Sequence, residues 1–282
     1  MAPEAELTGE ASRPIRVGSD APFYLGLGII GGTYVFLILA MVAADASFTS
    51  PGQLWRALAS PEIRYSLKLS LISCSLTAIL SVWFAVPLGY LLSRRDFPLK
   101  GLVDAVLDIP IVLPPLVVGL SLLILFQTPP GKAIERVIPV TYAVPSVILA
   151  QFSVACAFAV RTLRVTFDGL NPRSEQVALT LGCTKSKAFW RVVLPEARRG
   201  VLTAATLAWA RSLGEFGPIL VFSGATRMRT EVLPTTVFLE LSIGNLEAAV
   251  AVSLIMIVAA VAVLLLVRCL GSPSAFWRSA QP

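Results

Sequence analysis

The fold of this chain is decided by a patterned polar loop between two apolar segments, which reads EQVALTLGCTKSKAFWRVVLP over residues 175–195. Its first part, residues 174–182, predicts a short helix that ends at Gly182, because glycine readily takes the left-handed conformation of a helix C-terminal cap. A second amphipathic run follows over residues 185–194 and is closed by Pro195. Two short helices bent at a glycine predict a compact knob.

The knob carries apolar side chains suited to a partner's groove and basic side chains that would steer binding: Val177, Leu181, Phe189, Trp190, Lys185, Lys187 and Arg191. Docking of an amphipathic helix in a groove uses this combination. The alternative is an ordinary juxtamembrane loop whose basic residues lie on anionic lipid headgroups. Basic residues near lipid are common and by themselves favour this alternative.

On both sides of the knob the chain is too apolar for a soluble protein. Of its 282 residues, 56% are hydrophobic and 14% are charged, and the mean hydropathy is +0.78. Soluble domains usually carry about 25% charged residues. Six segments approach the roughly 20 residues that a helix needs to cross the hydrocarbon core: 23–44, 69–92, 109–126, 142–160, 201–222 and 246–267. The sequence predicts an all-α integral membrane protein with six transmembrane helices.

Two of these segments allow other interpretations. The first ends at Ala44-Asp45-Ala46, which resembles a signal-peptide cleavage site. Its apolar run exceeds the usual 7–15 residues of a signal peptide, so an uncleaved anchor is predicted. The third contains Pro114, Pro115 and Gly119. Its two prolines predict a break in the middle of the helix, and its bounds are the least well defined.

The basic residues orient the chain in the membrane. With a cytoplasmic N-terminus, 15 Lys and Arg residues fall inside and 7 outside, and Arg211 lies within a span. Because cytoplasmic segments are enriched in Lys and Arg, both termini are predicted to be cytoplasmic. The net charge of +6 is then an orientation signal and not a nucleic-acid footprint. The predicted organisation is a polar lead (1–22), a transmembrane domain (23–268) with a long cytoplasmic loop (161–200), and a short tail (269–282).

Several kinds of chemistry are excluded. The chain has no histidine, and its four cysteines are widely separated without metal-ligand spacing. We expect no catalytic residue, no metal site and no cofactor in this subunit, since it also lacks a phosphate-binding Gly-x-x-x-x-Gly-Lys loop. Asp104 and Asp108 stand four residues apart, but the apolar residues around them favour the solvated face of an interfacial helix over acid–base chemistry.

The stretch from Glu175 to Pro195 resembles the EAA loop of binding-protein-dependent ABC importer permeases. The resemblance implies a type I ABC importer fold and a coupling helix seated in a cytoplasmic ATPase dimer, which would bind the ATP and Mg. The coupling residues would be Glu175, Gln176, Val177, Ala178, Leu181, Gly182, Phe189, Leu194 and Pro195. One departure is that Gln176-Val177-Ala178 stands at the family's Glu-Ala-Ala, so the acidic contact to the ATPase is shifted or lost.

Two further stretches, LPPLVVGL at 113–120 and RSLGEFGP at 211–218, resemble the molybdate, tungstate and sulfate group of these permeases, most closely the molybdate branch. This implies an inner-membrane importer of a tetrahedral oxyanion, paired with a second permease subunit, most simply as a homodimer. An external solute-binding protein would deliver the anion. The outer segment 224–245 would receive it, although a plain connecting loop explains this segment equally well.

The candidate translocation path comprises Pro114, Pro115, Gly119, Arg211 and Glu215. Ionisable residues within a span usually face the bundle interior or a cavity. Arg211 and Glu215 share one helix face at i and i+4, so they are either a structural ion pair, which is slightly favoured because the charges cancel, or part of the anion path. A gradient-driven secondary transporter and a non-transporting membrane scaffold are the alternative functions.

Overall fold

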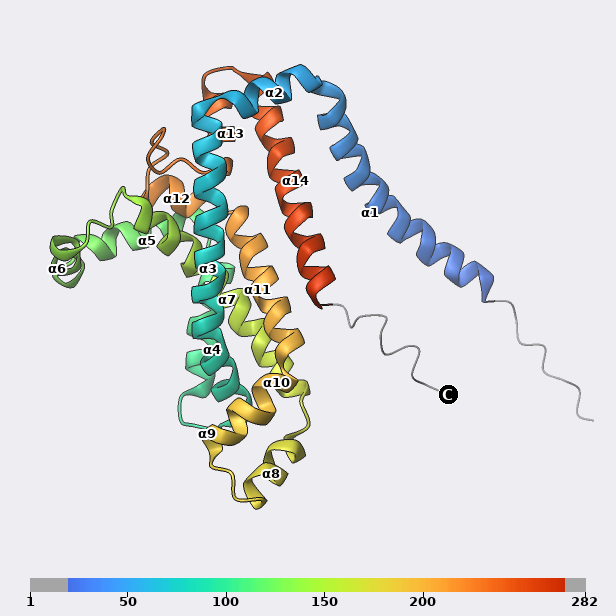
Figure 1. The fold of residues 1–282 in the computed structure, drawn as a ribbon, viewed down its shortest axis with the longest axis vertical. Helices are drawn as coiled ribbons and strands as arrows, with labels where there is room; N and C mark the ends of the chain where they lie inside the picture. Colours follow the sequence, from blue (N-terminus) through green and yellow to red (C-terminus); the bar gives the residue numbers. More distant parts are fainter. Residues whose placement is uncertain (1–19, 272–282) are drawn as a thin grey trace, which may run out of the picture. The chain divides into compact units, whose positions relative to one another are not determined.

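The computed structural model describes residues 20–271, and within that range the chain forms helices and no β-strand (Figure 1). It divides into two units, Met1–Ser47 and Phe48–Pro282. The first is represented by α1 (Ala21–Phe48), a 28-residue apolar helix with no buried residue. Residues 1–19 of the predicted lead and 272–282 of the predicted tail lie outside the described residues.

The second unit is built on three helices that pack against one another: α3 (Pro61–Arg94), α7 (Val144–Gly169) and α11 (Arg198–Leu213). Their contact surfaces combine small and weakly polar side chains, as is usual where membrane helices approach closely, with larger apolar ones such as Leu163 and Phe167 of α7. The small polar residues that α3 buries include Ser66, Ser70, Ser73, Thr77 and Ser81. Near its end, Gly89 lies so close to α7 that an added Cβ would sit 3.0 Å from the backbone nitrogen of Arg164.

Helices α2 (Pro51–Ala59), α13 (Leu233–Ser242) and α14 (Leu246–Gly271) complete one side of this unit. Ser50 starts α2 with a capping box, in which its hydroxyl accepts from the Gln53 N–H and the Gln53 side chain accepts from the Ser50 N–H. Both α2 and α13 pack against α14. Figure 1 shows α2 and α13 at one end of the α3–α7–α11 bundle and α8 and α9 at the opposite end.

Two predicted spans are broken in the structure. The third is divided into α4 (Lys100–Val112) and α5 (Pro115–Gln127), which meet at an angle of 113°, and α6 (Pro129–Val137) follows. The break falls at Pro114 and Pro115, because a proline lacks the backbone N–H that would continue the helix. The fifth is divided into α11 and α12 (Gly217–Phe222) by the segment from Gly214 to Phe216.

Among the described residues, four helices are long and apolar enough to cross a membrane: α1, α3, α7 and α14 through Leu265. The bent pair of α4 and α5 raises the number to five if it is one span. The break in the third segment falls at the two prolines that predicted it, whereas the interruption of the fifth segment between Leu213 and Gly217 was not predicted.

The first part of the predicted cytoplasmic loop is helical. Helix α7 continues to Gly169 and includes Arg161 and Arg164. The knob consists of α8 (Pro172–Thr180), α9 (Lys185–Ala188), the π-helix η1 (Phe189–Val193) and α10 (Leu194–Glu196), which leads towards α11.

Candidate functional site: the knob and the broken helices

Gly182 bends the knob as the sequence predicts. Its φ is +86°, in the left-handed region. The Gly182 N–H donates to the Leu179 carbonyl and the Cys183 N–H donates to the Ala178 carbonyl, each at 3.0 Å. These two bonds are those of a Schellman motif, which satisfies the last carbonyls of a helix. The predicted glycine cap is confirmed.

Pro195 does not close the second run, contrary to the prediction. It lies in the first turn of α10, and the chain remains helical through Glu196. Because proline cannot donate to the carbonyl four residues earlier, the preceding turn widens: the Leu194 N–H donates to the Phe189 carbonyl in the i to i+5 pattern of a π-helix. Pro195 thus remains exposed on the knob, and Leu194 is half-buried.

The apolar residues of the knob fall into two groups. Val177, Leu181 and Trp190 are exposed, and Leu181 is 80% exposed. Ala178 is buried, and Phe189 turns inward and packs edge-to-face against Tyr90 of α3 with ring centroids 4.8 Å apart. Phe189 therefore secures the knob to the bundle and is not, as predicted, a free groove-filling side chain.

A polar anchor that the sequence did not reveal holds α8 to α3. The Tyr90 hydroxyl donates to Glu175 Oε1 at 2.6 Å, and Arg94 Nε lies 3.8 Å from Glu175 Oε2. Arg94 also donates to the Leu170 carbonyl at 3.0 Å. Glu175 is thus used inside the subunit, while Gln176 beside it is exposed and neutral.

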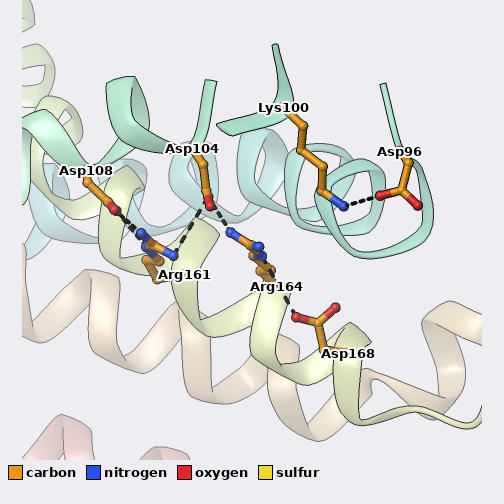
Figure 2. A network of polar contacts seen from close by, with 7 residues as sticks. All are labelled: Asp96, Lys100, Asp104, Asp108, Arg161, Arg164 and Asp168. Atoms are coloured by element: carbon orange, nitrogen blue, oxygen red, sulfur yellow. Dashed lines mark hydrogen bonds and ion pairs between the residues drawn. The ribbon is translucent and has the colours of Figure 1, made fainter. Parts of the chain in front are cut away.

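Asp104 and Asp108 form an ion-pair network with α7 and not the solvated face that we predicted (Figure 2). Asp108 binds both Arg161 Nε, at 2.6 Å, and Arg161 Nη2. Asp104 accepts from Arg164 and lies 3.7 Å from Arg161 Nη1. The two aspartates are one turn apart on α4 and the two arginines one turn apart on α7, so the helices pair along their length. The network links α4, which precedes the 113° bend, to α7, which leads into the knob.

The two broken segments, which the sequence proposed separately for the path, are in direct contact. An added Cβ on Gly119 of α5 would lie 2.7 Å from Pro218 Cα of α12, and one on Gly217 would lie 2.9 Å from Pro115 Cβ. Gly119 and Gly217 are buried, whereas Pro114 and Pro115 are exposed at the bend. The two glycines let α5 and α12 approach backbone to backbone.

Replacing Gly119 by alanine is expected to lower the free energy of unfolding by about 1–3 kcal/mol, because the added methyl group meets backbone that cannot rotate away. The matched control is Gly101→Ala on α4, where no atom lies within 4 Å of the added Cβ and the change should stay within about 0.5 kcal/mol. Thermal unfolding of both purified variants in detergent measures the difference. Equal midpoints would contradict the close packing.

Arg211 and Glu215 form an ion pair of 2.9 Å across the end of α11. The Glu215 side chain is 1% exposed and that of Arg211 is 31% exposed. The Arg211 guanidinium carbon also lies 5.6 Å from the centre of the Phe158 ring on α7. Neither carboxylate oxygen of Glu215 accepts a hydrogen bond of good geometry from the described residues, so Arg211 supplies its main compensation.

Gln151 is a further residue at this break that the sequence analysis missed. It is buried on α7, accepts from the Thr77 hydroxyl at 3.2 Å, and donates to the Ser212 carbonyl at 3.2 Å. The Ser212 carbonyl lies in the last turn of α11, where the regular backbone hydrogen bonds of the helix end. The signal was a lone amide in the apolar segment 142–160, since polar side chains within a span usually bond to neighbouring helices.

The predicted outer segment folds into a tight turn and α13. Arg227 pairs with Glu240 at 2.8 Å, and Glu240 also accepts from Asn245 at 2.8 Å. Glu231 is fully buried, and burial raises the pKa of its carboxyl above the usual value. A cavity of about 450 Å³ lies between this segment, α2 and the start of α3.

The chain is similar to known transport proteins along most of its length. Residues 85–272 match the family of binding-protein-dependent transport system inner membrane components. The chain is 33% identical to the probable molybdenum ABC transporter permease protein of Haloferax volcanii, over 86% of this chain and 89% of that protein. It is 30% identical to the sulfate transport system permease protein of Escherichia coli, over 88% and 91%.

Solved structures agree with this assignment at the level of the fold. A bacterial ABC transporter involved in the import of the acidic polysaccharide alginate has a chain that superposes with a TM-score of 0.69. The sequences are 17% identical, and the match covers 89% of this chain and 95% of that one. The fold is therefore that of an ABC importer permease. On the family match and the relatives together, this chain belongs to the binding-protein-dependent transport system inner membrane components.

Proposed function

We propose that this chain is the transmembrane permease subunit of an ABC importer that moves a tetrahedral oxyanion into the cytoplasm. The single observation that carries the proposal is the similarity, over 86–88% of the chain, to permeases described as molybdenum and sulfate transporters. We propose molybdate as the first candidate substrate. Tungstate and sulfate are the other candidates, because they are also tetrahedral dianions. The subunit itself hydrolyses no ATP.

The knob would be the point at which a cytoplasmic ATPase dimer drives the permease. Its outer surface presents Val177, Leu181 and Trp190 for a groove in the ATPase, and Lys187 and Arg191 add positive charge beside them. The ATPase would bind ATP and Mg. Phe189 and Glu175 fix the knob to α3, so a displacement of the knob would move α3 and the bundle as rigid elements.

The translocation path would run beside the contact between α5 and α12, with Pro114, Pro115, Gly119, Arg211 and Glu215 around it. Two permease subunits, most simply two copies of this chain, would rock between outward-open and inward-open states. We further propose six spans, with α11 and α12 together as one of them, both termini in the cytoplasm, and the inner membrane as location. A solute-binding protein would dock on the outer end formed by α2 and α13.

Reconstitution tests the proposal. The permease is placed in proteoliposomes with the ATPase and the binding protein of its own system, and uptake of molybdate, tungstate and sulfate is measured with and without ATP. We expect uptake that requires ATP, the ATPase and the binding protein. Uptake driven by an ion gradient alone would identify a secondary transporter. No flux of any anion, with changes at Pro114 and Arg211 tolerated, would identify a scaffold.

A further inference from the structure

A cavity of about 590 Å³ lies between the knob and the end of α3, beside the contacts that join them. Its walls from α3 include Pro87, Leu91 and Arg95, and its walls from the knob include Leu179 and Lys185. Val177, Leu181 and Trp190, the apolar part of the proposed ATPase surface, do not line it, whereas Gln176, Lys185 and Phe189 of the predicted coupling segment do. The cavity and the apolar part of the ATPase surface are therefore different parts of the knob.

The charge of the cavity is positive and uncompensated. Its one carboxylate, Glu175, is already bound by the Tyr90 hydroxyl and by Arg94. Arg95 and Lys185 are exposed and form no ion pair with any residue between 20 and 271. The cavity thus offers two free cations to an anionic group.

An apolar surface leads to this positive end. Ile79, Trp83, Pro87 and Leu91 of α3 and Arg95 at its C-terminal cap follow one another at four-residue spacing, so each lies beside the next in a row that winds around the helix by about 40° per step. All five are exposed, and Trp83 is 71% exposed. The row is apolar for its first four residues and basic at the fifth. A ligand that fits this order has a hydrocarbon part along α3 and a negative charge beside Arg95 and Lys185.

We propose that this cavity binds the headgroup of an anionic phospholipid of the cytoplasmic leaflet, with its acyl chains along the exposed face of α3. Basic pockets at the cytoplasmic ends of membrane helices bind acidic headgroups in this way. The proposal rests on the orientation given under the proposed function but not on the transported anion. The bound lipid would stabilise the position of the knob relative to α3, where a displacement of the ATPase would be transmitted to the bundle.

The test measures lipid retention by the full-length permease. Lipid-stripped protein in neutral detergent is titrated with phosphatidylglycerol or phosphatidylcholine, and bound lipid is measured by native mass spectrometry. We expect a preference for phosphatidylglycerol that Arg95→Gln with Lys185→Gln weakens about 30-fold, the factor expected for losing two cations that face an anionic headgroup. Both residues are exposed and have no ion-pair partner in the part of the chain that the structure describes, so the double variant should fold, and its thermal unfolding midpoint checks this.

The matched control is Arg173→Gln with Arg198→Gln, which removes the same charge from exposed positions outside the cavity. This pair should retain phosphatidylglycerol as the unmodified protein does. Equal retention of the two lipids by the unmodified protein would overturn the proposal, as would an equal loss in the control pair. Binding of inorganic phosphate with the same dependence on Arg95 and Lys185, without lipid retention, would show a free-anion site instead. Because no transport is measured, failure here leaves the proposed function untouched.

Discussion

Replacing Gly182 by proline is expected to abolish ATP-driven uptake, by at least about 100-fold, while the protein remains inserted in the membrane. Proline holds φ near −65°, and the native φ here is +86°. The variant also loses the N–H that donates to the Leu179 carbonyl. The knob would therefore unfold locally, because α8 and α9 no longer meet at the required angle. No atom lies within 4 Å of an added Cβ at this position, so the damage should stay in the knob.

A companion variant, Leu181→Asp, places a charge on the most exposed apolar side chain that we assign to the ATPase surface. It should prevent coupling without disturbing the bend, since a buried charge in an interface is costly. The matched controls are Gly182→Asn, whose side chain tolerates the left-handed conformation, and Leu181→Met. Uptake, membrane insertion and co-purification of the ATPase are measured for all four. Full uptake by both Gly182→Pro and Leu181→Asp would refute the coupling role of the knob.

The parts of the fold that the sequence predicted depend on local properties. Hydropathy located α1, α3, α7 and α14, because a span needs an apolar run of known length. The left-handed cap at Gly182 was predictable because glycine takes this conformation more readily than other residues. Pro114 and Pro115 indicated a break, but the 113° angle depends on how α5 packs against α12, which no local pattern contains.

The errors concern partners that are distant in sequence. Asp104 and Asp108 read as solvated because nothing in their own segment opposes them, and their arginines lie more than 50 residues later. Glu175 and Phe189 were assigned to a partner protein because Tyr90, which holds both, is on another helix. Side-chain pairs of this kind become visible only when the order of helix packing is known.

The pair of Arg211 and Glu215 allows a second large effect to be predicted. Arg211→Gln alone is expected to lower the free energy of unfolding by about 3–5 kcal/mol, because it leaves the buried Glu215 carboxylate without its compensating charge. The assembled permease should then be recovered in much smaller amount. Arg211→Gln combined with Glu215→Gln removes both charges and should restore assembly to near the original level. Size-exclusion chromatography and thermal unfolding of the three proteins measure the coupling.

Transport by the restored double variant then separates the two roles of Arg211. If the pair is structural, as its near-cancelling charges favour, the double variant should import the anion within about 3-fold of the original rate, since it leaves no buried charge without a partner. If Arg211 attracts the anion, the double variant assembles, but half-maximal uptake needs at least about 10-fold more anion. Glu215→Gln alone is the decisive control, because it keeps the positive charge and removes its neutraliser. If the pair is structural, Glu215→Gln should leave the affinity for the anion unchanged. If Arg211 attracts the anion, Glu215→Gln should raise that affinity.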